Sequence, residues 1–174
     1  MSELKKFVRE IPDFPKPGIL FRDITGILQS AEGFKLAIDE LQKIVEEAKP
    51  DVIVALESRG FLFGTPIAYN LNIPVVLCRK KGKLPCATVE KTYDLEYGSA
   101  TVEIHKDAIQ PGQRVLIIDD LLATGGTAKA AIDLAEMLGG KVVKLVFVME
   151  LLGLEGRRKL DGYDVGCVLS YEGA

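Results

Sequence analysis

The segment RVLIIDDLLATGGTAKAA, residues 114–131, constrains the fold of this chain more than any other feature. It opens with a continuous apolar run, residues 115–118, which is typical of a strand buried on both faces of a parallel sheet. Asp119 and Asp120 are expected at the carboxyl end of that strand, and residues 124–127 (TGGT) are expected to form a turn. Apolar residues at helical spacing begin as the turn closes. The segment therefore predicts a strand, turn and helix unit of an α/β protein.

The glycine turn has the composition of an anion site. Amides of such a turn, together with the unpaired amides and positive dipole end of the following helix, bind phosphate groups. A Walker A loop is excluded because Gly126 is followed by Thr127 and Ala128, and a dinucleotide fingerprint is excluded because the glycines are adjacent. A plain capping turn with two solvated aspartates is the alternative, but adjacent carboxylates repel unless a cation or a hydroxyl-rich ligand satisfies them. The segment thus favours a phosphorylated sugar as ligand.

The length and charge of the chain narrow its class. A chain of 174 residues with 48% hydrophobic and 27% charged residues suits one enzyme domain, residues 1–174. A net charge of -3 argues against a nucleic-acid or membrane-surface binder. No apolar stretch approaches the roughly 20 residues of a membrane span, and the first residues, MSELKKFVREIPDF, lack the apolar core of a signal peptide. We therefore expect a cytoplasmic protein.

The cysteines and the histidine exclude several kinds of site. Cys78, Cys86 and Cys167 are odd in number and widely spaced, which favours neither a disulfide framework nor a zinc site. Cys78 and Cys167 lie in apolar patterns and are expected in the core. His105 is the only histidine, so neither a Ser-His-Asp hydrolase nor a multi-histidine metal site is expected. We expect His105 at the surface.

Periodicity along the chain predicts a mostly parallel central sheet flanked by helices. Helices are predicted over residues 33–48 and 60–71, and buried strands over residues 51–56, 73–78, 142–149 and 165–169. Residues 88–89 and 93–104 are more polar, alternate at 100–104, and contain a turn at 97–99. This part predicts an antiparallel excursion or a lid.

Two cationic loops are expected to face the acidic, glycine-rich loop, because ligands of such sheets bind outside the carboxyl ends of the strands. Ser58, Arg59 and the Gly60 amide follow one strand at the start of a helix, where Arg59 can clamp a phosphate bidentately. The alternative for Arg59 is a surface ion pair. Four cations follow the next strand, with a solvated loop as the alternative; they are Arg79, Lys80, Lys81 and Lys83.

One ligand accounts for all three loops: a pentose with a monophosphate at one end, hydroxyls in the middle and a pyrophosphate at the other end. The monophosphate would lie on residues 123–127, and the ribose hydroxyls would bind Asp119 and Asp120. Arg59, Lys80 and a magnesium ion would neutralise the pyrophosphate. Magnesium suits a site that offers only oxygen ligands, most of them from substrate and water, so no residue of the chain is expected as a dedicated metal ligand.

The run VLIIDDLLATGGT resembles the phosphoribosyl pyrophosphate signature of the purine phosphoribosyltransferases, in the form carried by the adenine branch. Further family segments follow in family order and cover nearly the whole chain; they are FPKPGILFRDIT (14–25), ESRGFLFG (57–64), RKKGKLP (79–85) and YDLEYGSATVEIHKDAIQPGQRV (93–115). The acid pair is shared with orotate and xanthine relatives, whereas LLATGGT with LEYG and PGILFRD is specific for the adenine branch. The resemblance implies an α/β, single-domain type I phosphoribosyltransferase fold with an N-terminal hood (1–32) and a flexible, β-rich lid (85–105).

The resemblance also implies an activity of purine salvage. A member of this branch transfers 5-phosphoribose from 5-phospho-α-D-ribose 1-diphosphate (PRPP) to adenine with Mg²⁺, giving AMP and diphosphate, and is usually a homodimer. The implied phosphate cradle is Ala123, Thr124, Gly125, Gly126 and Thr127. The implied base site is Leu20, Phe21 and Arg22 above adenine with Leu121 beneath, the implied diphosphate contacts are Ser58, Arg59 and Lys80, and the implied lid contacts are Glu96 and Tyr97.

These roles agree with the chemistry. Departure of diphosphate builds positive charge on the ribose ring, which Asp119 and Asp120 favour, and a closing lid keeps water out. Glu96 can take the proton lost as the purine nitrogen attacks, with a strand-surface acid as the alternative. Leu20 and Phe21 would otherwise be core residues.

Two other functions stay open at this point. A relative acting on xanthine, hypoxanthine or orotate is disfavoured by LLATGGT and by the hood segment. A non-catalytic regulator that binds PRPP and a nucleic acid or another partner would need a basic face or an added domain, for which an acidic chain of 174 residues leaves little room.

Overall fold

The computed structural model describes residues 2–95 and 98–173. Its strands are β1 (Arg9–Pro12), β2 (Leu20–Asp23), β3 (Val52–Leu56), β4 (Val75–Lys80), β5 (Thr88–Asp94), β6 (Ser99–His105), β7 (Arg114–Leu122), β8 (Lys141–Leu151) and β9 (Val165–Tyr171). Its α-helices are α1 (Thr25–Leu28), α2 (Ala31–Ala48), α3 (Gly60–Leu71) and α4 (Gly126–Met137), and its 3-10 helices are η1 (Glu3–Phe7), η2 (Leu152–Leu154) and η3 (Gly156–Leu160). No helix of this described part is long and apolar enough to cross a membrane.

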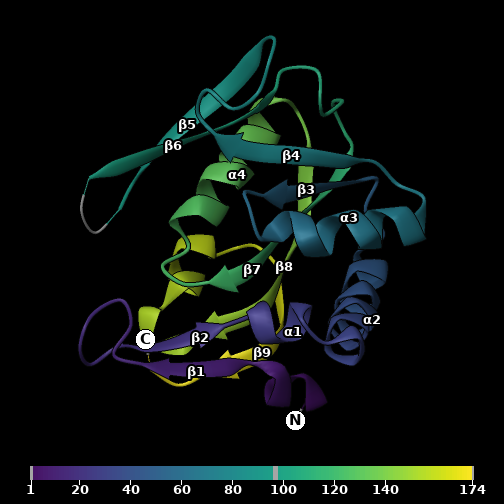
Figure 1. The fold of residues 1–174 in the computed structure, drawn as a ribbon. Helices are drawn as coiled ribbons and strands as arrows, with labels where there is room; N and C mark the ends of the chain where they lie inside the picture. The colour runs from purple at the N-terminus through teal and green to yellow at the C-terminus, as the bar shows by residue number, and fades with distance from the viewer. Residues whose placement is uncertain (1, 96–97, 174) are drawn as a thin grey trace.

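The main sheet has seven strands in the order β5-β6-β4-β3-β7-β8-β9 (Figure 1). Neighbours from β4 through β3, β7 and β8 to β9 pair in parallel, whereas β6 is antiparallel to both β4 and β5. The β5–β6 hairpin pairs with β4 at only two positions, Arg79 with Glu103 and Lys80 with Val102. The mostly parallel sheet and its antiparallel excursion are therefore confirmed.

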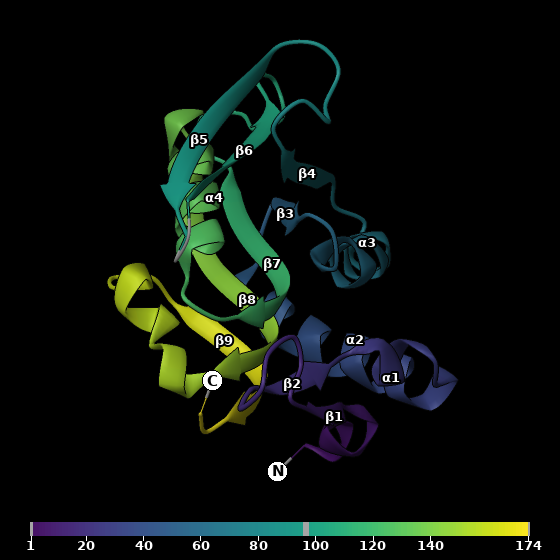
Figure 2. The same cartoon turned by 60° about the vertical axis from the view of Figure 1, so that its left-hand side comes forward.

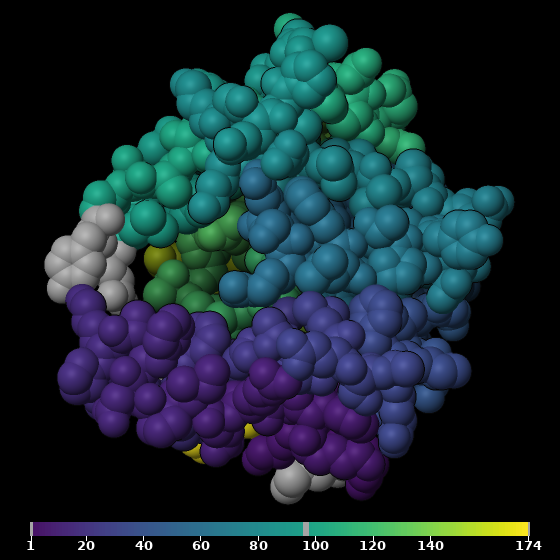
Figure 3. Space-filling view, viewed as in Figure 1, coloured from purple at the N-terminus to yellow at the C-terminus, as the bar shows by residue number. Residues whose placement is uncertain are grey.

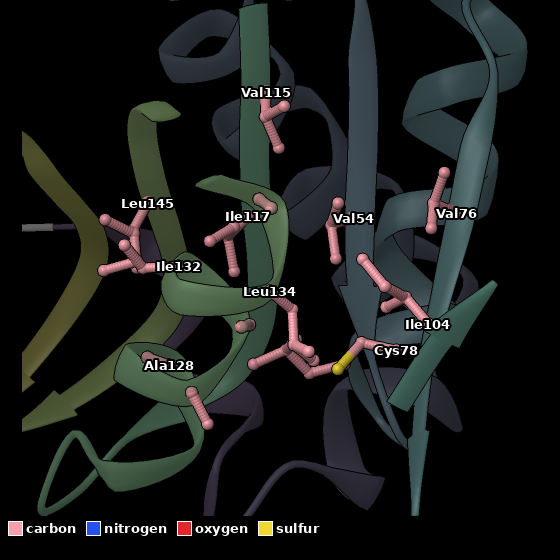
Figure 4. Packing of buried hydrophobic residues seen from close by; sticks show 14 of the residues in the cluster. Val54, Val76, Cys78, Ile104, Val115, Ile117, Ala128, Ile132, Leu134 and Leu145 are labelled. Carbon is pink, nitrogen blue, oxygen red and sulfur yellow. The ribbon is translucent and has the colours of Figure 1, made fainter. Parts of the chain in front are cut away.

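Helices cover both faces of the sheet, with α4 on one face and α2 and α3 on the other (Figure 2). Successive strand residues point to opposite faces, so Val54 and Ile117 belong to the core beneath α4, while Ile53 and Leu116 belong to the core beneath α2 and α3. Figure 4 shows the first of these cores, in which strand side chains meet apolar residues of α4 such as Leu134. Burial on both faces explains why the strands are continuous apolar runs.

The N-terminal segment forms a second, smaller unit. β1 and β2 pair antiparallel in a sheet of their own, with Glu10 opposite Arg22. This hairpin lies beside the carboxyl end of β7 (Figures 1 and 2). Phe21 and Ile24 line a pocket there together with Leu121 and Met149. The hood segment thus reaches the edge of the sheet at which ligands of parallel sheets bind.

Three expectations from the sequence were wrong in detail. The strand expected over residues 115–118 continues to Leu122, so Asp119 and Asp120 lie inside β7, because this part of β7 still pairs with β8. Similarly, β4 runs on to Lys80, because residues 79–80 pair with β6. Cys78 is buried as expected, but Cys167 is only half-buried, on the terminal strand β9.

Candidate active site

A cleft of about 400 Å³ lies at the carboxyl ends of β3, β4 and β7. Its walls come from these strands, from the start of α3 and α4, and from the β5–β6 hairpin. The lining residues are Glu57, Ser58, Arg59, Cys78, Lys80, Tyr93, Val102, Asp119, Asp120, Leu121 and Thr127. Figure 3 shows the hollow between the N-terminal segment and the β5–β6 hairpin, with the segment around β7 and α4 as its floor. The three loops that the sequence placed together therefore do converge.

The two aspartates have different surroundings. The Asp120 side chain is only 6% exposed, and its Oδ2 accepts a hydrogen bond of 2.5 Å from Arg59 Nε. Asp119 Oδ1 accepts from the Asp120 backbone amide at 2.9 Å. Burial, and then the negative charge of Asp120, raise the pKa of the Asp119 carboxyl well above its ordinary value. The pair is electrostatically unfavourable as it stands and would be relieved by a cation or a sugar hydroxyl.

A glycine at the start of α3 lets that helix approach the acid pair. A Cβ on Gly60 would lie 2.7 Å from the Ile118 carbonyl oxygen and 3.1 Å from Asp119 Oδ1, which is closer than side chains tolerate. Ser58 and Arg59 directly precede this point and line the cleft. Arg59 is thus placed beside Asp120, and the ion pair considered for it is present, although with a site residue rather than with a surface acid.

The predicted cluster of four cations is wrong for three members, because Arg79, Lys81 and Lys83 are not among the described residues that line the cleft. Arg79 donates from Nε to Glu57 at 3.2 Å, and Lys81 Nζ donates to Glu90 at 2.9 Å, because β3 and β5 place acids beside them. Of the four, Lys80 is the one that lines the cleft. Its backbone amide donates to Glu57 at 2.8 Å, so a single carboxylate holds both Arg79 and the Lys80 backbone.

The glycine turn forms a small pocket of about 80 Å³ that adjoins the cleft and is lined by residues 121–128 with Asp119 and Phe147. Gly125 has φ 77°, a left-handed conformation that favours glycine, and a Cβ there would lie 2.5 Å from the Gly156 carbonyl oxygen. Because α4 begins at Gly126, the first amides of the helix have no partner within it. The predicted cradle thus has unpaired donors and a concave shape.

Tyr93 is a site residue that the sequence analysis missed. Its hydroxyl accepts a hydrogen bond of 2.9 Å from Thr127 Oγ1, and its ring packs so close to Gly126 that a Cβ there would lie 3.1 Å from Tyr93 Cδ2. Lys91, on the same face of β5, pairs with Asp133 of α4 at 2.9 Å. Alternation from Val89 through Lys91 to Tyr93 was the signal available, because alternate residues of a strand share one face.

A second pocket, also about 80 Å³, adjoins the cleft under the hood. Phe21, Arg22 and Leu121 line it, as the sequence analysis expected, together with Asp23, Ile24, Thr25, Arg59, Asp120 and Met149. Leu20 lies on β2 but is not among the described residues that line this pocket. The Arg22 guanidinium pairs with Glu10 and lies 4.5 Å from the Tyr171 ring centre, so its charge is already engaged.

Two expected site residues, Glu96 and Tyr97, lie outside the described residues. Within residues 2–95 and 98–173, no group of three or more His, Cys, Asp or Glu side chains is arranged to hold a metal ion.

Comparisons with known proteins agree with this geometry. Residues 24–172 match the family model described as "Phosphoribosyl transferase domain". The chain is 62% identical over 173 residues to the adenine phosphoribosyltransferase of Butyrivibrio fibrisolvens, which covers 99% of this chain and 96% of that protein. Among solved structures, it superposes on the enzyme of that name from Thermoanaerobacter pseudethanolicus with TM-score 0.93 and 53% identity, covering 97% of this chain and 98% of that one. The Saccharomyces cerevisiae enzyme, solved with an imino-altritol bisphosphate and adenine, gives TM-score 0.87 and 46% identity over 94% of each chain.

Proposed function

Since the chain belongs to the phosphoribosyltransferase family, and within it to the adenine phosphoribosyltransferases, we propose that it transfers the 5-phosphoribosyl group of PRPP to adenine. The products are AMP and diphosphate, so the reaction salvages a free purine. The observation that carries the proposal is the juxtaposition, in one cleft, of an acid pair, a glycine turn at a helix start and a basic edge. Each of these surfaces matches one part of the donor substrate.

The 5-phosphate would lie on Ala123, Thr124, Gly125, Gly126 and Thr127. The unpaired amides at the start of α4 supply hydrogen-bond donors there, and the helix dipole favours negative charge. A phosphate bound in this way fixes one end of the sugar, which orients the reacting carbon at the other end.

Asp119 and Asp120 would accept hydrogen bonds from the ribose hydroxyls. As diphosphate leaves, positive charge grows on the ribose ring, and two nearby carboxylates stabilise that charge more than they stabilise the neutral ground state. Burial, and then the charge of Asp120, raise the pKa of Asp119, and the same positive charge would relieve the repulsion between the two carboxylates.

Arg59, Lys80 and Ser58 would hold the diphosphate. The Arg59 side chain is 51% exposed, so it has room to turn from Asp120 toward a bound anion. Cations on the leaving group favour its departure, which acts in the same direction as the acids on the ring.

A Mg²⁺ ion would fit this site if it were held mainly by the diphosphate of the substrate and by water. The cleft offers the carboxylates of Asp119 and Asp120 on one side, and Mg²⁺ is commonly bound by one or two carboxylates, substrate phosphates and water. When bound, the ion neutralises diphosphate oxygens. The residues of the chain then need only orient the sugar and exclude water.

Adenine would lie in the pocket lined by Phe21, Arg22 and Leu121, with Leu20 of the same hood segment above it. Glu96 would take up the proton released when the purine nitrogen attacks, and Tyr97 would lie beside it in the closed lid. Closure of residues 85–105 would keep water from the cationic sugar.

The same proposal includes the organisation of the protein. Residues 1–174 form one phosphoribosyltransferase domain, with the hood at residues 1–32 and the lid at residues 85–105. The enzyme acts as a cytoplasmic homodimer on small-molecule substrates, with no nucleic-acid or membrane partner.

A purine panel tests the proposed function. The protein is incubated with PRPP, Mg²⁺ and either adenine, guanine, hypoxanthine, xanthine or orotate, and nucleotide and diphosphate are measured. Product from adenine is expected. Product from another base alone would reassign the acceptor. Tight PRPP binding without turnover of any base would instead favour a non-catalytic regulator that binds PRPP.

The double variant Asp119→Ala and Asp120→Ala should lose turnover while keeping its circular dichroism spectrum, with Lys81→Ala as the matched control because Lys81 pairs with Glu90 on the lid hairpin. Full activity of the double variant would refute the ribose site.

A further inference from the structure

The segment that follows β8 lies directly against the glycine turn. A Cβ on Gly156 would lie 2.2 Å from the Ala123 carbonyl oxygen, and a Cβ on Gly125 would lie 2.5 Å from the Gly156 carbonyl oxygen. The two backbones therefore touch at two points, with no room for a side chain between them. A shift of Gly156 would therefore displace the turn at residues 123–125.

A buried ion pair sets the position of Gly156. Glu150 lies near the end of β8, its side chain is 4% exposed, and it pairs through its backbone with Leu122 of β7 and Ser170 of β9. Arg157 Nε donates to both carboxylate oxygens of Glu150, at 2.8 and 2.9 Å. A buried carboxylate is costly without such a partner, so Arg157 is strongly held.

Two further contacts hold the Arg157 guanidinium in place. Its Nη1 donates to the Val165 carbonyl oxygen at 2.9 Å, and its Nη2 lies 3.7 Å from Cys167 Sγ. Both partners are on β9, so the guanidinium joins β9 to Glu150 of the neighbouring strand β8. Because Gly156 directly precedes Arg157, the backbone beneath the turn is fixed to the rigid sheet.

We propose that Glu150 and Arg157 are positioning residues for the 5-phosphate site, acting through Gly156 on the turn Ala123–Gly125. Neither residue is among those that line the cleft or the turn pocket, so they act without touching the substrate. The inference rests on the proposed function, which assigns the 5-phosphate to that turn. It applies to ligands that carry a 5-phosphate, namely PRPP and AMP, and not to free diphosphate.

Calorimetric titration of the whole protein with AMP, and separately with diphosphate and Mg²⁺, tests the inference. Arg157→Ala should weaken AMP binding about tenfold or more, since small misplacements of binding groups have effects of this size, and should leave diphosphate binding within about twofold. Arg157→Lys keeps the charge but not the planar, forked hydrogen bonding, so its affinity for AMP should lie between those of the unmodified protein and Arg157→Ala. Arg158→Ala is the matched control, because Arg158 is 77% exposed and pairs only with the neighbouring Glu155 among the ion pairs of the described residues.

The outcomes separate the two claims. Unchanged AMP binding in Arg157→Ala, or equal loss of AMP and diphosphate binding, would overturn the positioning role. If Arg157→Ala fails to fold, Arg157→Lys decides by the same ratio of affinities. Absence of AMP binding to the unmodified protein would instead refute the proposed function.

Discussion

Asp119→Asn should make the protein more stable while removing its activity. Asp119 is part of an acid pair whose carboxyls lie close together within β7, and burial followed by the Asp120 charge raises its pKa above the ordinary value of 3.8. Asparagine has nearly the same shape, and its Oδ1 still accepts the Asp120 amide. The substitution therefore removes the repulsion and keeps the hydrogen bond.

The size of the gain follows from Coulomb's law. Two unit charges about 4 Å apart repel by about 4 kcal/mol at an effective dielectric constant of about 20, which sets the upper limit for this pair. Attraction between Asp119 and Arg59 offsets part of this, which leaves a net gain in the free energy of unfolding of about 1–2 kcal/mol. For a chain of this length, the melting temperature should rise by roughly 2–8 °C.

The gain should depend on pH in a definite direction. An unfolded aspartate loses its proton near 3.8, whereas folded Asp119 keeps it to a higher pH, so the stability contribution of Asp119 is lost as pH rises. Asparagine does not titrate. The advantage of the variant should therefore be absent below about pH 3, grow above about pH 4, and be complete once pH exceeds the folded pKa.

Thermal unfolding followed by circular dichroism between pH 3 and pH 8 measures this. Asp133→Asn is the matched control. Burial raises the pKa of the Asp133 carboxyl, but hydrogen bonds from Lys129 and Lys91 outweigh burial and lower that pKa below its ordinary value. The Asp133→Asn variant should therefore be less stable than the unmodified protein at neutral pH. A lower melting temperature for Asp119→Asn at pH 7, or a gain that persists at pH 3, would refute the electrostatic reasoning.

Three further results are expected. Lys80→Ala should raise the KM for PRPP about tenfold or more, since Lys80 lines the cleft, whereas Lys81→Ala, which breaks the pair with Glu90, should change it less than about twofold in steady-state assays. Phe21→Ala should raise the KM for adenine by about 10- to 100-fold, because it removes one wall of the pocket proposed for the base, and an unchanged KM would place the base elsewhere. Glu103→Gln should lower the free energy of unfolding by about 1–3 kcal/mol at pH 7, since Glu103 accepts the backbone amides of residues 83–84. Those hydrogen bonds lower the pKa of Glu103 below 4.5, so the difference from the unmodified protein should shrink as pH falls through the folded pKa, and a constant difference in chemical denaturation would contradict this origin.

The sequence predicted the elements that have a strong period or a clear capping signal. Helix α3 begins and ends where expected, and helix α2 begins two residues before its predicted start because Ser30 caps it through the Gly33 amide. The carboxyl ends of strands were less accurate. Asp119 and Asp120 look like loop residues by polarity, yet pairing with β8 keeps them extended, and no local signal reports on that partner.

For the candidate site, the sequence predicted which loops meet but not all of the contacts between their side chains. Chain topology was enough to bring residues 57–60, Lys80 and residues 119–127 together, because parallel strands align their carboxyl ends. Neutralisation of Arg79 by Glu57 and the contact of Tyr93 with Thr127 depend on strands distant in sequence. Alternation along β5 assigns Tyr93 to one face of its strand, but tertiary packing decides which partners these side chains meet, and neither composition nor spacing reports those partners.

The β5–β6 hairpin pairs with the rest of the seven-stranded sheet through β4 alone, at two positions. Parting the β5–β6 hairpin from the rest breaks pairing with β4 at two positions and withdraws Val102 and Ile104 from one hydrophobic core, whereas parting β3 from β7 breaks pairing at four positions at the centre of both cores. Amide hydrogens of the hairpin should therefore exchange with solvent together, through an opening of lower free energy than global unfolding, while those of β3 and β7 exchange only when the whole protein unfolds. The part of the sheet that covers the cleft can thus rearrange without loss of the part that holds the acids.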